Sequence, residues 1–274
     1  MSHDQYLADN QANWNDRVPI HAGPDGYRLD RYVDDPNRIS EVVARDKAYL
    51  GDISGKTLLH LQCHIGTDTV SLARLGAKVT GVDFSAPALD VARGLASDLG
   101  LDATFVQSDV YAAAEVLDEQ FDIVYTGVGA INWLPDVARW AQVVAACTRP
   151  GGTFYMQEGH PFLWALDHDR TDGQLVVTEP YFEEVQPATW NEGTTYLGTG
   201  TVDHTTSHEW NHGLGEILTA LIGAGFRIDR LDEHTSLYWL ALQHMYEETE
   251  GHWVLPEHQR NRVPLMYSLK ATRT

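Results

Sequence analysis

The sequence predicts an α/β fold in which a mostly parallel β-sheet carries helices on both faces. Short apolar runs alternate with amphipathic segments between residues 56 and 158, as in strands joined by crossover helices. Glycine follows several of the helical segments, as expected where helices end. Acidic residues stand at the ends of two apolar runs, which is where an open α/β sheet holds its ligand.

The elements of this sheet can be placed in order along the chain. Five strands are expected at 56–63, 77–84, 103–110, 121–128 and 153–158. Helices are expected at 69–75, at 86–99, near 111–117 and from Asp136 to the Pro-Gly-Gly turn at 150–152. Apolar runs of this length indicate strands buried on both faces.

The alternation is interrupted after residue 158. Residues 159–208 are rich in Thr, Gly, Asp and aromatic residues, and we interpret them as a partly β insertion after the fifth strand. An apolar helical face follows at 214–222, and further strands are expected at 226–234 and 263–271, giving seven in all. Residues 1–55 are polar, with one helix predicted at about 37–50, and we separate them as an N-terminal segment from a domain at 56–274.

The amino-acid composition disfavours some classes of binding partner for this protein. The formal net charge of -20 disfavours nucleic acid, because binding a phosphate backbone depends on Lys and Arg. No run approaches the 18 or so apolar residues of a membrane helix, and two cysteines inside apolar runs indicate a reducing compartment. We therefore expect a cytoplasmic protein whose partner is a small molecule; its oligomeric state is not predicted.

Three residues at strand ends form a candidate cofactor site. Gly66 lies in the turn after the first strand, Asp83 ends the second strand and Asp109 ends the third. A glycine turn lets the backbone approach a ligand closely. Asp83 can accept hydrogen bonds from both hydroxyls of a ribose, and Asp109 can accept one from an adenine amino group, with Phe84 and Val110 on the two ring faces. These demands fit S-adenosylmethionine (SAM).

The order of these segments resembles the class I SAM-dependent methyltransferases. The segments LLHLQCHIG, GVDFS, FVQSDV, FDIVYTGVGAINWLPD and RPGGTFYM carry the resemblance over residues 55–160. It implies a Rossmann-like sheet whose seventh strand is antiparallel and lies between strands five and six. Gln62 and His64 replace two of the three glycines of the first motif, and His60 its usual acid. LHLQCH and GTDT are similar to an uncharacterised bacterial subgroup of these enzymes.

The resemblance implies a SAM site with S-adenosylhomocysteine (SAH) as its product. The residues expected to bind the cofactor are Trp14, Gln62, His64, Gly66, Asp68, Thr69, Asp83, Phe84, Ser85, Asp109, Val110, Thr126 and Gly127. His64 is expected to contact the carboxylate or the ribose. A non-enzymatic SAM or nucleoside sensor on the same fold stays open as an alternative.

Two other readings are weaker. A nicotinamide dehydrogenase needs three glycines in G-x-G-x-x-G, and this window lacks two of them. A zinc hydrolase is suggested by H-E-x-x-H at residues 208–212, but Leu218 stands where a third histidine ligand is expected. The pair also needs a continuous helix, whereas we expect one to begin near Asn211. We therefore predict no metal at His208 and His212.

Methyl transfer requires an oriented acceptor and exclusion of water. His160 is the first candidate for a general base, and His212 and Tyr27 are further candidates near the same sheet edge. Residues 1–36 are expected to be a lid that covers the cofactor with aromatic side chains. The aromatic residues of the insertion are expected to form the opposite wall of an acceptor pocket.

Overall fold

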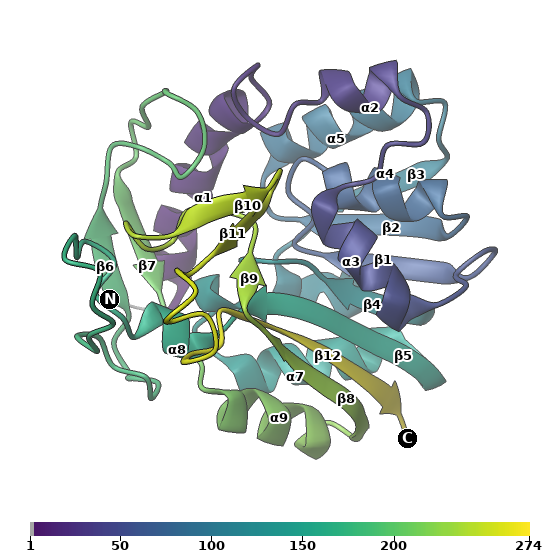
Figure 1. The fold of residues 1–274 in the computed structure, drawn as a ribbon. Coiled ribbons are helices and arrows are strands. Elements are labelled where there is room, and N and C mark those ends of the chain that lie inside the picture. The colour runs from purple at the N-terminus through teal and green to yellow at the C-terminus, as the bar shows by residue number, and fades with distance from the viewer. Residues whose placement is uncertain (1–2) are drawn as a thin grey trace.

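The computed structural model describes residues 3–274 and contains the predicted sheet (Figure 1). Met1 and Ser2, the first residues of the predicted lid, lie outside the described residues. The seven strands run in the order β3-β2-β1-β4-β5-β12-β8. They are β1 Thr57–Leu61, β2 Lys78–Asp83, β3 Ala103–Gln107, β4 Phe121–Thr126, β5 Thr148–Gly159, β8 Phe226–His234 and β12 Met266–Arg273. β12 is antiparallel to both neighbours, β5 and β8, so the predicted fold class is confirmed.

Helices cover both faces of the sheet because consecutive strand residues point in opposite directions. Leu58 of β1 packs with α3 and α4, whereas Leu59 packs with α7 and α9. Figure 1 shows α3 in front of the sheet and α7 behind it. The helices are α3 Glu41–Leu50, α4 Thr67–Arg74, α5 Ala86–Asp98, α6 Ala113–Leu117, α7 Val137–Cys147 and α9 Leu214–Gly223, with 3₁₀ turns η1 Val110–Ala112 and η2 Ile131–Trp133.

Two helix starts are fixed by side-chain caps. The Ser85 hydroxyl accepts the N–H of Ala88 at the start of α5, and Asp136 accepts the N–H of Arg139 at the start of α7. Each cap satisfies a backbone donor that has no partner within its helix. The cap at Ser85 places the start of α5 directly beside the end of β2.

The N-terminal segment is more ordered than its sequence predicted. The helix expected at about 37–50 is present as α3, whereas α1 His3–His21 and α2 Asp30–Asp34, which lie ahead of it, were not predicted. The buried face of α1 is largely polar. Asn10 donates to the carbonyl of His208 and accepts its N–H, so its amide completes the hydrogen bonding of that backbone. Asn13 donates to the carbonyl of His204 in the same way.

The insertion is partly β, as predicted. It contains α8 Pro161–Trp164, and β6 Ala188–Asn191 pairs antiparallel with β7 Thr206–Glu209. A three-stranded sheet of β9 Ser236–Leu237, β10 Tyr246–Thr249 and β11 His252–Val254 was not predicted. It has its own apolar cluster, which includes Leu163 of α8 and Leu237 of β9. Both additions lie on the same side of the main sheet in Figure 1.

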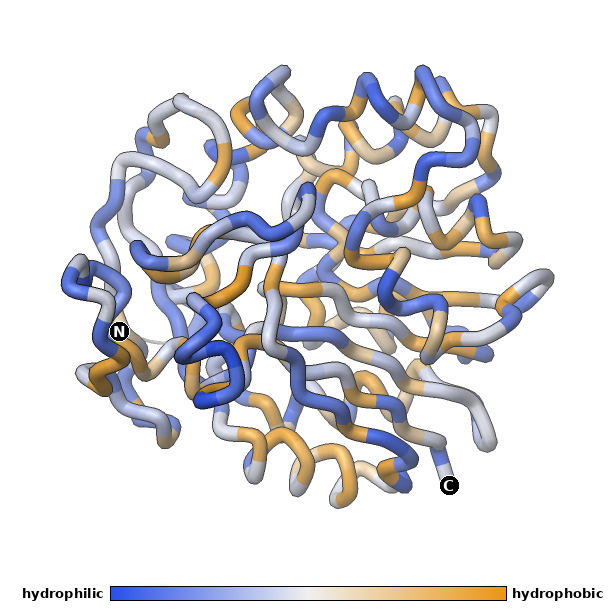
Figure 2. The backbone as a smooth tube through the Cα atoms, viewed as in Figure 1, coloured by the Kyte–Doolittle hydropathy of each residue, from blue (hydrophilic) through white to orange (hydrophobic). Residues whose placement is uncertain are grey.

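Hydropathy along the chain follows this arrangement. Figure 2 shows α9 hydrophobic over most of its length, in agreement with Ile217 and Leu221 packing in the main core. Among residues 3–274, no helix combines the length and hydrophobicity that a membrane span requires.

Candidate functional site

The loop between β1 and α4 has an unusual backbone. Gln62, His64 and Gly66 have φ angles of 56°, 49° and 79°, so all three glycine positions of the motif are left-handed. Gly66 also lacks room for a side chain, because a Cβ there would lie 2.7 Å from the Cβ of Ala92. A left-handed residue other than glycine costs about 1–2 kcal/mol. The chain therefore retains the backbone shape of the glycine motif with two residues that strain it.

The side chains of Gln62 and His64 connect this loop to its neighbours. The Gln62 amide donates to the carbonyl of Ala130 after β4, with 2.8 Å between nitrogen and oxygen. The His64 Nε2 lies 2.8 Å from Nδ1 of His21 at the end of α1. Glycine could make neither contact, so these contacts offset part of the backbone strain.

Asp83 lies at the end of β2, beside the same loop. Its two carboxylate oxygens each accept one backbone N–H at 2.8 Å, from His64 and from Ser85. The side chain is buried, and this burial raises the pKa of Asp83 to about 6. A carboxylate has about four acceptor positions, so Asp83 keeps acceptor capacity beside its backbone contacts.

A pocket of about 410 Å³ lies beyond Asp83, between α1 and the ends of β2 and β3. This volume is in the range of small-molecule sites. Asp109 contributes its side chain and also caps η1 by accepting the N–H of Tyr111. Phe84 lines the pocket, whereas Val110 packs in the main core. The lining residues are Asp4, Leu7, Ala8, Gln11, Phe84, Gln107, Ser108 and Asp109.

Aromatic side chains of α1 cover the cofactor loop. The Trp14 ring meets the rings of His64 and Trp133 edge to face, at centroid distances of 5.0 and 5.2 Å. Burial lowers the pKa of His21 to about 4 and holds the pKa of His64 well below its usual value. Both imidazoles are therefore neutral at pH 7 and share one N–H between them. His21 also contacts Thr195 of the insertion through Nε2.

Tyr27 belongs to the same cluster. Its hydroxyl is hydrogen-bonded to that of Tyr196 in the insertion, and its ring centroid lies 6.0 Å from that of His64. Burial raises the pKa of Tyr27 well above its usual value, so its hydroxyl keeps its proton at neutral pH. Of the three candidate catalytic residues, Tyr27 is the one that contacts the cofactor loop.

The ends of β1 and β4 bring together the remaining predicted binding residues. Thr69 of α4 contacts Nδ1 of His60 at 2.8 Å, and a Cβ on Gly127 would lie 3.4 Å from Oδ2 of Asp68. Burial raises the pKa of Asp68 to about 6. Within residues 3–274, the buried hydroxyl of Thr126 has no hydrogen-bond partner.

The ring nitrogens of His160 and His212 are already engaged in polar contacts within the protein, so neither side chain is free to take a proton from an acceptor. Nδ1 of His160 accepts the N–H of Phe162 to cap α8, and Nε2 lies 3.0 Å from a carboxylate oxygen of Glu233. His212 donates from Nε2 to the carbonyl of Leu134 at 2.8 Å. The predicted general-base roles of His160 and His212 therefore have no support from this geometry.

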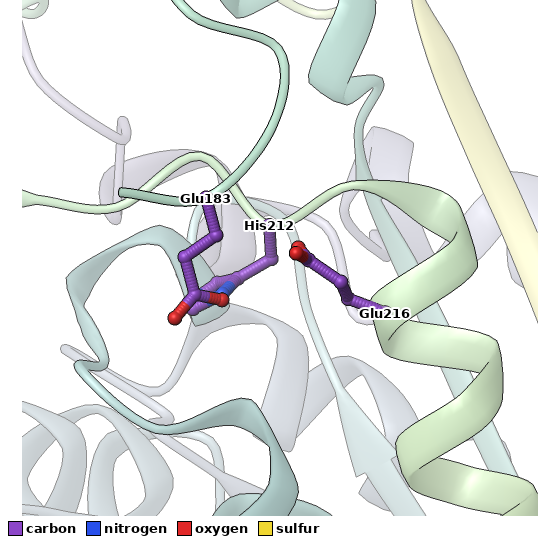
Figure 3. A group of neighbouring side chains, drawn as sticks. All are labelled: Glu183, His212 and Glu216. Carbon is purple, nitrogen blue, oxygen red and sulfur yellow. The ribbon is translucent and has the colours of Figure 1, made fainter. Parts of the chain in front are cut away.

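His212 also belongs to a small polar cluster with Glu183 and Glu216, whose ligand atoms lie within 4.8 Å of one another (Figure 3). Nδ1 of His212 lies 2.7 Å from Glu183, while Glu216 accepts the N–H of Gly213 at the start of α9. His208 is separate from this cluster, on β7, where it contacts Asp9 and Thr189. The H-E-x-x-H residues thus lack the continuous helix of a zinc hydrolase. That His208 and His212 bind no metal stays a prediction.

The expected acceptor pocket between the lid and the insertion differs from the prediction. The cavity beside Glu158, Trp210 and His212 is only about 10 Å³, enough for about one water molecule. Phe182 and Trp190 of the insertion are exposed, and Trp164 stacks on His168 and Trp239. Among the aromatic residues predicted for this wall, Tyr196 is the one that reaches the N-terminal segment.

Glu158, at the end of β5, is a site residue that the sequence did not indicate. Its buried carboxyl accepts the N–H groups of Gly129 and Ala130 in the loop after β4. Burial raises the pKa of Glu158 to about 8. Like Asp83 and Asp109, Glu158 is an acidic residue at the end of an apolar strand. That pattern in the sequence could have identified it.

This raised pKa predicts a pH dependence of stability. In the folded protein Glu158 keeps its proton up to about pH 8, whereas in the unfolded chain it loses it near pH 4.5. The unfolded state is therefore favoured as pH rises through this window. Glu158→Gln mimics the protonated form. We expect its free energy of unfolding to exceed that of the wild type by at least about 1 kcal/mol at pH 8 and to be nearly equal to it at pH 4.5. Urea unfolding at both pH values measures this, and an equal difference at both would contradict it.

Comparison with known proteins first indicates the class of protein to which part of this chain is similar. Residues 58–152 match the family model described as a methyltransferase domain. This segment runs from β1 into β5 and includes Gly66, Asp83 and Asp109. The match covers less than half of the chain, and it coincides with the part of the sheet that carries the candidate cofactor site.

Particular relatives agree with this class. The ubiquinone biosynthesis O-methyltransferase of Photorhabdus laumondii is 35% identical over 117 residues, which are 43% of this chain and 47% of that protein. The chain thus spans about half the length of the curated relatives it matches. A SAM-dependent methyltransferase from Mesorhizobium loti has a TM-score of 0.57 at 20% identity, over 84% of this chain and 96% of that one. A glycopeptide N-methyltransferase complexed with SAM has a TM-score of 0.54 at 19% identity, over 85% of this chain and 93% of that one. This chain therefore has the Rossmann-like fold of these enzymes.

Proposed function

We propose that this protein is a methyltransferase that moves the methyl group of SAM to a small organic acceptor. The observation that carries the proposal is the arrangement of three strand ends. The left-handed loop at 62–66, the buried carboxylate of Asp83 and the pocket beside Asp109 follow one another across β1, β2 and β3. A nucleoside with an amino-acid tail needs a close backbone, a ribose acceptor and an adenine pocket in this order.

When bound, SAM would supply a methyl group on a positively charged sulfur; a bond from the acceptor atom to the methyl carbon would form as the methyl–sulfur bond breaks in line, with SAH as the leaving group. The protein orients the two reactants and excludes water. Asp83 and Asp109 would hold the nucleoside, and the loop at 62–66 would hold its amino-acid end. The Trp14 ring contacts His64 of that loop and the ring of Trp133, and aromatic rings favour a nearby positive charge.

A small acceptor is supported by the acidic surface and by the relatives. The net charge of -20 repels a nucleic-acid backbone. The curated relatives are named for O-methylation in ubiquinone biosynthesis, so a hydroxyl on a small organic molecule is the first acceptor group to test. The Gln62 and His64 form of the loop supports assignment to the bacterial subgroup that the sequence resembles.

Calorimetry with SAM and SAH tests the cofactor assignment. We expect binding at micromolar affinity, and Asp109→Ala should weaken it about tenfold, because a hydrogen bond to a charged acceptor is worth about 1.5–3 kcal/mol. Asp102→Ala is a matched control, since this exposed aspartate lies at the opposite end of β3. Absence of binding in the wild-type protein would refute the proposal.

Turnover separates an enzyme from a sensor. Labelled methyl transfer from SAM to a panel of phenols, amines and thiols, followed by product mass, should identify at least one acceptor. A protein that binds SAM and methylates no acceptor in such a panel would instead support the sensor alternative.

A further inference from the structure

Arg17 is a buried cation without an acidic partner. Its residue is 7% exposed. Within residues 3–274 no carboxylate lies within salt-bridge distance of its guanidinium, and the buried Nε atom has no hydrogen-bond partner. An arginine offers five N–H donors and stays charged in proteins. Burial of an unpaired charge is unfavourable by several kcal/mol, so such a group needs an explanation.

The contacts of Arg17 are aromatic faces. Its guanidinium carbon lies 5.0 Å from the ring centroid of Trp14 and 5.3 Å from that of Trp133. Such cation–π contacts are worth about 0.5–2 kcal/mol each and leave the N–H edges of the guanidinium without acceptors. Glu192 and Glu209 act on Arg17 only through the electrostatic field, without an ion pair. The rings therefore hold the cation in place and leave its hydrogen-bonding edge available.

The position of Arg17 places that edge at the candidate site. On α1, Arg17 lies one helical turn from both Trp14 and His21, and both of these rings contact His64 of the cofactor loop. Trp133 follows β4. Arg17 thus lies on the side of the lid that contacts the loops after β1 and β4, which is where the amino-acid end of a cofactor and the acceptor would meet.

We propose that Arg17 binds the carboxylate group of a ligand at this site. A guanidinium forms two parallel hydrogen bonds with a carboxylate, and this geometry suits a planar fork held against aromatic faces. The inference rests on the proposed function, and the carboxylate has two possible sources there. It belongs either to the amino-acid end of the cofactor or to a carboxylate-bearing acceptor.

Arg17→Gln removes the charge and tests both sources. SAH is measured against 5′-methylthioadenosine, which shares the nucleoside and lacks the amino-acid end, and benzoate is measured as a simple carboxylate in the presence of saturating SAH. Arg28→Gln is the matched control, because Arg28 belongs to the same segment but is exposed and paired with Asp30. We expect Arg17→Gln to weaken SAH or benzoate at least tenfold and to leave methylthioadenosine unchanged. Loss on SAH assigns the cofactor carboxylate, and loss on benzoate alone assigns the acceptor.

Thermal unfolding without ligand distinguishes this role from a structural one. If Arg17 serves to bind a ligand, its buried and unpaired charge lowers the stability of the ligand-free protein. Arg17→Gln should therefore have an unchanged or higher Tm. Unchanged SAH and benzoate affinity, equal loss on SAH and methylthioadenosine, or a Tm lower by several degrees would each overturn the proposal. A wild-type protein that binds neither SAH nor methylthioadenosine would instead refute the proposed function, independently of Arg17.

Discussion

Deletion of residues 1–30 is expected to abolish methyl transfer and weaken SAM binding while the sheet stays folded. Helix α1 supplies one wall of the pocket beside Asp109 and covers the loop at 62–66 through Trp14 and His21. The two main cores of the sheet, in contrast, include no buried residue of α1. Far-UV circular dichroism and thermal unfolding check the fold, and calorimetry and the methyl-transfer assay check function.

A milder variant controls for damage by the deletion. Asn10→Ala breaks the two hydrogen bonds between α1 and the backbone of His208 and should reduce turnover in the same direction. Asn37→Ala, at an exposed position just beyond the predicted lid at residues 1–36, should have no effect. Hydrogen exchange should show α1 becoming more protected when SAH is added. A truncated protein with full activity, and an α1 that exchanges equally with and without SAH, would refute the lid.

Asp83→Ala is expected to weaken SAM and SAH binding by roughly 1.5–3 kcal/mol, about 10- to 150-fold. The carboxylate is buried and already aligned by the N–H groups of His64 and Ser85, so it meets a ribose without reorganisation. The same pair of contacts fixes the loop at 62–66, and the variant loses that support as well. Calorimetry at pH 7.5 measures the change.

Two comparisons isolate the carboxylate of Asp83. Asp98→Ala, an exposed residue at the end of α5, should bind SAH as wild type does. Because burial raises the pKa of Asp83 to about 6, SAH affinity of the wild type should also fall as pH decreases through 6, where the protonated carboxyl loses acceptor capacity. An affinity that is equal in Asp83→Ala and wild type would exclude Asp83 from the cofactor site.

The sheet was predictable because its strands are buried on both faces. Such strands appear in the sequence as apolar runs. Their carboxyl ends indicate the edge of the sheet where a ligand binds, whatever the sequences of the loops. Asp83 and Asp109 were found in this way. The antiparallel position of β12 came from the family resemblance, since periodicity does not give strand order. The short strands β9, β10 and β11 have few residues each and no repeated apolar pattern.

Helix α1 was missed because its buried face is not apolar. Asn10, Asn13, Arg17 and His21 recur at helical spacing, but a search for hydrophobic periodicity does not detect amides and cations. Their burial depends on partners far away in the sequence, such as the backbone of His208. The general-base roles predicted for His160 and His212 lack support from the geometry for a related reason. A sequence shows which residues can act as bases but not which nitrogen is already occupied by a helix cap or a carbonyl.

The amide contacts between α1 and β7 have a consequence for the order of events in a catalytic cycle. The side chains of Asn10 and Asn13 are hydrogen-bonded to backbone groups of the insertion. Helix α1 and the insertion therefore either move together or lose these hydrogen bonds at once. If the protein is the methyltransferase proposed above, release of its spent cofactor requires α1 and the insertion to move together. Under that proposal, the rate of this shared movement sets an upper limit on turnover.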